Sequence, residues 1–278
     1  MNSASTFKKT TLAALSLLLC GCANFGNVMT HPEAVVQSIK IVQTTSEEIR
    51  LLAVLEFNNP NPLTLQLAKI DYRFRLDRNV VAVGSLTNLP LIRNHQLQSV
   101  EIPVVLKSQT IRAVLPAPDK NGGYAYRFTG QAFSNNSWDT APILFDAEGQ
   151  LLLPQVPASR LSGLNTSRDG KKPEFGVEIF NPNVFPIEVR RLQGQGEFDT
   201  LPYVWEFRPR KLSIAAGQTR RIFVPCRPVG HTGAEAAAGK ISAGAVLNYW
   251  LQGELECLSP QGVIMLVIQQ KGGVGKKN

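Results

Sequence analysis

Histidine and cysteine, the side chains that most often build metal and nucleophilic sites, are scarce in this 278-residue chain, which has three histidines and four cysteines. His31, His95 and His231 lie far apart, and none has a cysteine or carboxylate at metal-ligand spacing. After residue 22 there is no His-Glu-x-x-His, Cys-x-x-Cys or Gly-x-Ser-x-Gly motif. We therefore expect a protein with no metal, no cofactor and no enzymatic activity.

Dense basic segments and long apolar runs are lacking as well. The formal charge is +8, but lysine and arginine are scattered along the chain and form no basic stripe with interleaved aromatic residues. This spacing argues against nucleic-acid binding and allows at most weak attraction to anionic lipid head groups. No segment after residue 22 is long and apolar enough to cross a bilayer.

One short apolar run stands near the N-terminus. Lys8 and Lys9 precede an apolar stretch over residues 12–19, which is shorter than the ~20 residues of a membrane-spanning helix. It ends in Leu19-Cys20-Gly21-Cys22, which resembles a bacterial lipobox. The pattern predicts a signal peptide over residues 1–21, and the resemblance implies that Cys22 receives a diacylglyceryl thioether and an N-acyl chain.

Lipidation at Cys22 would attach the mature chain to a membrane without a spanning helix, because each buried methylene contributes ~0.8 kcal/mol. Ala23 stands where aspartate would favour the inner membrane, so the lipobox analogy favours the outer membrane, facing the periplasm. Cutting before Cys22 leaves 257 residues, enough for two sandwich domains, with a charge of +6. The expected partners are the membrane, through Cys22, and client proteins or an apolar ligand.

Two thiols would remain besides the lipidated one, Cys226 and Cys257. An oxidising envelope compartment permits a disulfide between them if the geometry allows it. Two alternatives are therefore open, a disulfide or two buried and unpaired cysteines.

An internal duplication runs through the chain. The segment 57–63 (FNNPNPL) matches 179–185 (IFNPNVF), which places Asn181 at an offset of 122 from Asn59. Segment 101–104 matches 223–226 at the same offset, and 126–130 matches 249–253 at an offset of 123. A period this long indicates two copies of a domain, since the repeats of a solenoid span ~20–50 residues.

Each copy has the pattern of a β-sandwich, with short apolar runs, period-two alternation and turn residues between them. The strands expected in the first copy are 35–44, 49–57, 63–67, 70–76, 80–83, 99–106 and 124–133. Those expected in the second are 175–180, 185–189, 212–214, 219–224 and 246–257. One short helix is expected in each copy, over 108–115 and 235–245. The sequence thus predicts an all-β fold of two tandem antiparallel sandwiches of the immunoglobulin-like or fibronectin-like kind.

The expected organisation is a signal peptide over 1–21, a lipidated tether over 22–31, sandwiches over 32–154 and 155–270, and a flexible tail over 271–278. The boundary near Gln155 lies in a Pro- and Gly-containing segment, 153–173, which suits a linker followed by the first strand of the second copy. The second copy departs from the first after Val189, where Gly194-Gln195-Gly196 replaces the apolar alternation of residues 72–74. This departure concerns the edge strands of the second copy and not its class.

The paired Asn-Pro-Asn motifs, Asn59-Pro60-Asn61 and Asn181-Pro182-Asn183, have a physical logic as turns. The first asparagine is pushed into an extended conformation by the proline, and the proline cannot donate to a sheet. The second asparagine tolerates the dihedral angles of a turn. The motif therefore predicts a structural turn between two strands, and the alternative is a polar binding rim made by the amides.

This arrangement resembles the water-stress and hypersensitive-response (WHy) domain of late embryogenesis abundant type 2 proteins. The residues that carry the resemblance are 55–65 (LEFNNPNPLTL), 176–187 (GVEIFNPNVFPI) and the strand 126–130. The resemblance implies a seven-stranded sandwich with one short helix in each copy, and a link to desiccation, cold or osmotic tolerance. Bacterial relatives are often envelope lipoproteins, which agrees with Cys22.

The segment 271–276 (KGGVGK) is similar to the deviant phosphate loop of partitioning ATPases. A phosphate loop needs a following Ser or Thr for magnesium and a helix whose N-terminus faces the phosphates. Lys277 occupies that next position, so we expect no nucleotide binding.

The function expected is a non-enzymatic envelope lipoprotein that protects against desiccation or osmotic stress by binding or shielding clients at the membrane surface. One alternative is a periplasmic carrier of a lipid or other apolar ligand, which needs a solvent-reachable apolar cavity. The other is an assembly subunit of an envelope complex, bound through an edge strand.

Overall fold

A computed structural model describes residues 29–115, 123–137, 140–166, 173–199, 201–229 and 246–274. Within these ranges nearly all regular structure is β-strand, and the one helix is the short α2 (Ser108–Val114). Every strand pairing is antiparallel except a short parallel contact between β1 and β17. The expected all-β class is therefore confirmed.

The first half of the chain forms two sheets packed face to face. One sheet has the order β1-β2-β6 and the other β4-β3-β7-β8, with β5 paired to β3. Alternate residues of β2, from Ile49 to Phe57, are buried in a single core cluster between the sheets, as the period of a half-buried strand requires. The strands are β1 (Glu33–Thr44), β2 (Glu48–Asn59), β3 (Leu65–Leu76), β4 (Asn79–Leu86), β5 (Leu91–Ile92), β6 (Gln96–Lys107), β7 (Gly123–Ser134) and β8 (Ile143–Leu152).

The second half repeats this order around a core cluster of its own. The order β9-β10-β14 corresponds to β1-β2-β6, and β12-β11-β16-β17 corresponds to β4-β3-β7-β8. The short strand β13 pairs with β11 as β5 pairs with β3, and the short strand β15 on β12 has no counterpart among the described strands of the first half. The strands are β9 (Ala158–Thr166), β10 (Pro173–Phe180), β11 (Ile187–Phe198), β12 (Leu201–Phe207), β13 (Ser213–Ile214), β14 (Thr219–Pro225), β15 (Arg227–Pro228), β16 (Leu247–Ser259) and β17 (Gly262–Val274).

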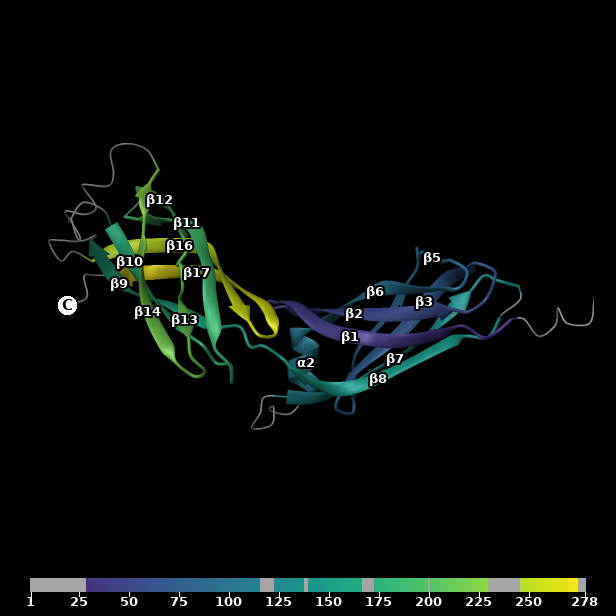
Figure 1. Ribbon diagram of the computed structural model, residues 1–278. Coiled ribbons are helices and arrows are strands. Elements are labelled where there is room, and N and C mark those ends of the chain that lie inside the picture. The colour runs from purple at the N-terminus through teal and green to yellow at the C-terminus, as the bar shows by residue number, and fades with distance from the viewer. Residues whose placement is uncertain are drawn as a thin grey trace, which may run out of the picture.

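The halves meet where the turn between β16 and β17 reaches the end of β1 (Figure 1). Gln43 pairs with Val263 and Thr44 with Ile264 in parallel register, so one sheet runs through both halves. Gly262 begins β17 at φ 112°, and a Cβ there would collide with the carbonyl of Ile41. Glycine is therefore required at this contact both for its backbone conformation and for space.

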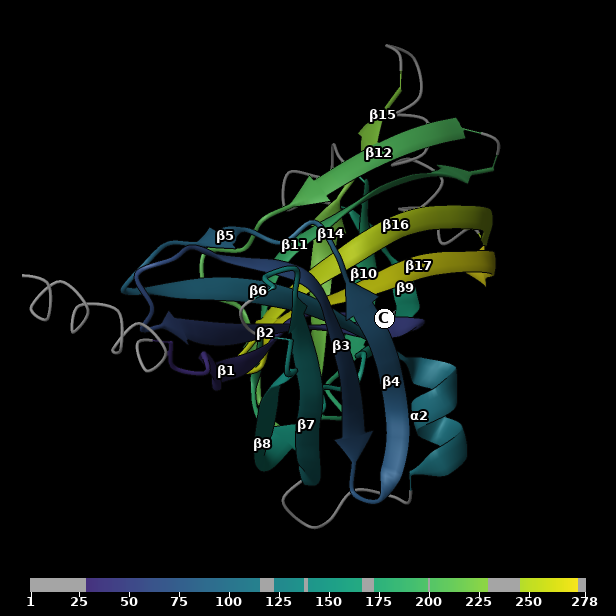
Figure 2. The ribbon, with the colours of Figure 1, turned by 90° about the vertical axis from the view of Figure 1, so that its right-hand side faces the viewer.

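The helix expected over 108–115 is confirmed as α2, which lies outside the sheets beside β4 (Figure 2). None of its residues is fully buried, and no side chain caps its N-terminus. It ends at Leu115, whose backbone N–H donates to the carbonyl of Ile111, and Pro116 follows. The helix expected over 235–245 lies outside the described residues.

At Gly194-Gln195-Gly196, where the second copy departs from the first, β11 continues to Phe198 and pairs with both β12 and β16. A Cβ on Gly194 would lie 2.3 Å from the carbonyl oxygen of Gln252 and 2.5 Å from the Trp205 ring, so these neighbours occupy the place of a side chain. Two expectations need correction. The expected tail is shorter, since residues 271–274 belong to β17 and pair with residues 247–250 of β16. Thr30, in the expected tether, forms two hydrogen bonds with the Asn61 side chain through its backbone, and it is therefore part of the first half.

Candidate functional site at the junction of the two halves

The first Asn-Pro-Asn motif forms a buried hydrogen-bond network. The Asn59 amide Nδ2 donates to three backbone carbonyls, those of Leu63 at 2.8 Å, Ile92 at 3.2 Å and Arg93 at 3.2 Å. Its Oδ1 accepts from the backbone N–H of Asn61 at 3.2 Å and from Asn61 Nδ2 at 3.3 Å. Asn61 also exchanges two hydrogen bonds of 2.7 Å with the backbone of Thr30. The motif thereby connects the segment before β1, the β2–β3 turn and the segment after β5 through hydrogen bonds.

The second motif repeats the network bond for bond. Asn181 Nδ2 donates to three backbone carbonyls at 2.8, 3.1 and 3.2 Å, and its Oδ1 accepts from Asn183 N at 3.1 Å and Nδ2 at 2.9 Å. Asn183 exchanges two bonds with the backbone of Gln155, at 2.7 and 2.9 Å. Gln155 therefore has the place at the start of the second half that Thr30 has in the first.

All four asparagines are buried, with exposures of 0 to 4%. Their amide groups bond to the backbone within the protein and do not face solvent. This geometry is that of a structural turn, and it gives no free amide for the alternative binding rim.

A cavity of about 490 Å³ lies at the end of the first sandwich, against the linker to β9. The β1–β2 turn, α2, the start of β7 and residues 153–156 of the linker form its walls. Its apolar lining comes from Ile49, Ile111, Leu115, Leu153, Pro154 and Val156. This volume lies within the range of ~300–1,000 Å³ that is usual for small-molecule sites.

Polar groups of two kinds face the same cavity. Thr44 is 1% exposed, and its Oγ1 has no hydrogen-bond partner. Arg112 of α2 is exposed at the cavity lining and takes part in no ion pair or hydrogen bond of the described residues. Tyr124 also lines the cavity, and burial, with a smaller effect of Asp77, raises the pKa of its phenol. The cavity therefore combines an apolar wall, neutral hydroxyls and one cation.

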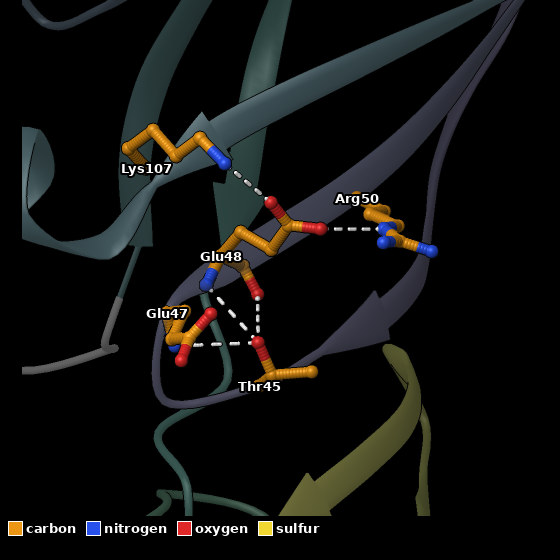
Figure 3. Close-up of polar contacts among 5 residues, drawn as sticks. All are labelled: Thr45, Glu47, Glu48, Arg50 and Lys107. Carbon is orange, nitrogen blue, oxygen red and sulfur yellow. Dashed lines mark hydrogen bonds and ion pairs between the residues drawn. The ribbon is translucent and has the colours of Figure 1, made fainter.

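The turn between β1 and β2 that forms one wall is stabilised by its own contacts (Figure 3). Thr45 Oγ1 accepts from the backbone N–H of Glu47 at 3.3 Å and of Glu48 at 3.1 Å. The Glu48 carboxylate binds Lys107 at 2.6 Å and Arg50 at 2.7 Å. Lys107, and then Arg50, lower the pKa of Glu48. Glu48 is thus ionised at neutral pH and paired with these two cations rather than with Arg112.

A wider hollow of about 590 Å³ lies on the second half, over β11, β12, β16 and β17. The alternation of these strands places its glutamine and glutamate side chains on the face opposite the core, among them Gln193, Gln195, Gln252 and Glu254. Its apolar lining residues are Val204, Trp205 and Val267, fewer than those of the junction cavity. We therefore take the junction cavity as the candidate site.

Cys226 and Cys257 are both buried, and both are free thiols in the structure. The structure thus has the second of the two alternatives that the sequence left open. Burial raises the pKa of the Cys226 thiol far above its usual range and that of Cys257 to about 12. Both thiols are therefore protonated at neutral pH and poor nucleophiles.

Among the described residues, no group of three or more His, Cys, Asp or Glu side chains could hold a metal ion. Within the same residues no helix has the length and apolar character needed to span a bilayer. The expected signal peptide over 1–21, the expected lipidation site Cys22 and His231 lie outside the described residues.

Sequence reasoning did not find the residues of the junction cavity. They come from four segments with no shared motif, and Thr44 is an ordinary residue at the end of a strand. The one available indication is the apolar spacing of Ile111 and Leu115, four residues apart on one face of the expected helix.

Comparisons with known proteins give no family. No family model matches the chain, and no curated protein matches it. Solved structures similar to it include a protein from Archaeoglobus fulgidus, with 13% identity, 46% of this chain and 99% of that chain covered and a TM-score of 0.35. A protein from Arabidopsis thaliana is similar with 16% identity, coverage of 46% and 85%, and a TM-score of 0.39. Red sea bream transglutaminase is similar with 11% identity, coverage of 100% and 34%, and a TM-score of 0.31. These TM-scores are too low to assign an activity or a partner.

Proposed function

We propose that this chain is a non-enzymatic bacterial envelope lipoprotein with two late-embryogenesis-abundant type 2 (WHy) sandwiches. In this proposal it protects clients at the membrane surface during desiccation or osmotic stress. The observation that carries the proposal is the pair of Asn-Pro-Asn networks, which make the same bonds in both halves at distances that differ by at most 0.4 Å. The motif on which the family resemblance rests is therefore a repeated structural unit.

The arrangement of charged groups supports a binding surface rather than a reaction centre. Glu178, on the sheet β9-β10-β14, binds Arg221 and Arg160 at 2.6 Å each, and these arginines lower its pKa. On the outer face of the first half, Asp146 binds Arg127, which lowers the pKa of Asp146. Carboxylates held ionised by arginine are poor general acids at neutral pH.

A surface of this kind gains from being held at the membrane. The sheet that runs through both halves fixes one sandwich against the other, so both could contact one client without the ordering cost of a flexible linker. A lipid on Cys22 would raise the local concentration of this surface at the membrane.

The test compares survival after drying of cells that lack the protein and cells that carry the wild type, Cys22→Ser or Cys20→Ser. Cys20→Ser is the matched control, because the lipobox places the lipid on Cys22. We expect Cys22→Ser to leave the outer-membrane fraction and lose protection, and Cys20→Ser to behave as wild type.

A second experiment tests the activity without the membrane. The soluble chain 23–278 is dried with a desiccation-sensitive enzyme, beside an unrelated β-sandwich at equal mass concentration. Higher enzyme recovery with chain 23–278 supports the proposal. Equal recovery, together with equal survival of deletion and wild-type cells, would contradict it.

A further inference from the structure

We propose that the junction cavity binds a single-chain fatty acid, with its carboxylate at Arg112 and its chain among Ile49, Leu115 and Val156. This proposal does not depend on the proposed stress function. Ligand binding and client protection are measured in separate experiments, so either can fail without the other. The chemistry of three parts of the cavity leads to this ligand class.

The first part is the apolar wall. Ile49 is 5% exposed and belongs to the first core cluster, and Ile111 and Leu115 pack against that cluster from α2. Leu153, Pro154 and Val156 of the linker line the same cavity. Apolar groups from the core, the helix and the linker thus line a volume of about 490 Å³ that is open to solvent on one side, which suits a flexible chain.

The second part is the unpartnered hydroxyl of Thr44. A buried hydroxyl without a hydrogen bond is costly, so native proteins normally supply a partner. Thr44 lines the cavity while its Oγ1 is buried, so a ligand oxygen could accept from Oγ1 once a rotation about χ1 brings the hydroxyl to the cavity surface. A pure hydrocarbon would leave this hydroxyl unpaired, which favours a ligand with an oxygen-bearing head group.

The third part is the charge of Arg112. This side chain has no carboxylate partner among the described residues, whereas the nearby Glu48 is already bound by Lys107 and Arg50. A guanidinium matches a carboxylate with two parallel hydrogen bonds. The cavity thus offers a cation for an anionic head group, and the neighbouring acid does not neutralise it.

The helix α2 gives the ligand a way in. None of its residues is fully buried, and it is tied to the sandwich by hydrogen bonds from Ser108 N–H to the carbonyl of Glu47 at 2.8 Å and from Asn79 Nδ2 to the carbonyl of Val114 at 3.1 Å. Displacing it would expose the apolar lining without breaking a sheet.

The experiment measures binding of sodium octanoate, decanoate and dodecanoate to the soluble chain 23–278 by isothermal titration calorimetry at pH 8, below micelle formation. We expect Kd to fall about fourfold for each added methylene until the cavity is full. Arg112→Gln should weaken dodecanoate binding about two- to fivefold, because ion pairs of exposed side chains are weak. The matched control Arg93→Gln, an exposed arginine beyond β5, should leave it unchanged.

Two further probes sharpen the result. The neutral ester glycerol monododecanoate should bind the wild type more weakly than dodecanoate does. Its affinity should be the same for the wild type and for Arg112→Gln. Ile111→Trp should block the chain of dodecanoate, and circular dichroism verifies that this variant folds. Since Arg112 is exposed, its variant should fold even if Ile111→Trp does not.

Three outcomes would overturn the proposal. They are no binding of dodecanoate at millimolar concentration, equal binding to wild type and Arg112→Gln, or tighter binding of a lysophospholipid with the same chain than of dodecanoate. Native mass spectrometry of chain 23–278 exported to the periplasm gives an independent check. An added fatty-acid mass that organic extraction removes would support the site.

Discussion

Replacing Asn59 by alanine tests whether the Asn-Pro-Asn motif stabilises the fold through its hydrogen bonds. In the native protein the Asn59 side chain takes part in five hydrogen bonds at 0% exposure, three as donor and two as acceptor. Alanine removes all five and leaves three carbonyls and the backbone N–H of Asn61 without that partner. The Asn59→Ala chain should therefore lose far more stability than a surface variant.

The magnitude follows from the worth of each bond. A buried hydrogen bond contributes ~0.5–1.5 kcal/mol net, and leaving a buried partner unsatisfied raises the loss, so we expect about 3–5 kcal/mol. This is a large share of the ~5–15 kcal/mol that stabilises a typical domain. With a urea m-value of ~1.5 kcal/mol/M, the midpoint should fall by roughly 2–3 M.

The neighbouring Asn58 provides the control, because it is exposed and its side chain takes part in no hydrogen bond among the described residues. Asn58→Ala should change stability by less than ~0.5 kcal/mol. Asn59→Asp keeps the shape but points an oxygen at three carbonyls, so it should destabilise at least as much as alanine. Hydrogen exchange of β2 and β10 reports on the two halves separately.

The same substitution at Asn181 should cost a similar amount and act on β10, since its bonds match those of Asn59. Equal urea midpoints for Asn59→Ala and Asn58→Ala would refute the reasoning. So would an Asn59→Asp variant as stable as the wild type, because burial alone, without the bonds, would then explain the motif.

Three other predictions follow from the structure. Lys107 and Arg50 lower the pKa of Glu48 from 4.5, so its ion pairs stabilise the fold above that pH, and this stability is lost as the pH falls through the lowered pKa. Glu48→Gln should therefore flatten the acid side of a curve of Tm against pH, and the control Glu47→Gln should not. Gly194→Ala forces a Cβ against the carbonyl of Gln252 and the Trp205 ring and should lower stability by about 2–4 kcal/mol. Gly217→Ala, at φ 66° with nothing within 4 Å, should lose only about 1 kcal/mol, and equal losses in thermal unfolding would argue against the packing explanation. In chain 23–278 both cysteines should resist a thiol reagent at pH 8 and react in 8 M urea, because burial raises the pKa of Cys226 and Cys257. Fast labelling of the native protein would show that the thiols are exposed, and fewer than two reactive thiols in urea would show that they form a disulfide.

Local patterns predicted most of the strands. The period-two alternation in residues 70–76 and the apolar run 49–57 lie in β3 and β2, and Pro116 marks the end of α2, because these features depend on neighbours in the chain. The strands β8, β12 and β17 were not expected. Gly, Glu or Gln residues interrupt the apolar pattern in β8 and β17, and each of the three strands pairs with the strand that precedes it in the chain.

The sequence by itself determined the β class, the duplication and the turn role of the asparagines, because each depends on residue type and spacing along the chain. Only the tertiary structure decided that Thr44, Ile111, Arg112 and Val156 surround one cavity, and that β1 and β17 share a sheet. It also decided that Gly194 leaves room for Trp205. These contacts join residues from different segments of the chain, and only strand pairing and tertiary packing bring them together.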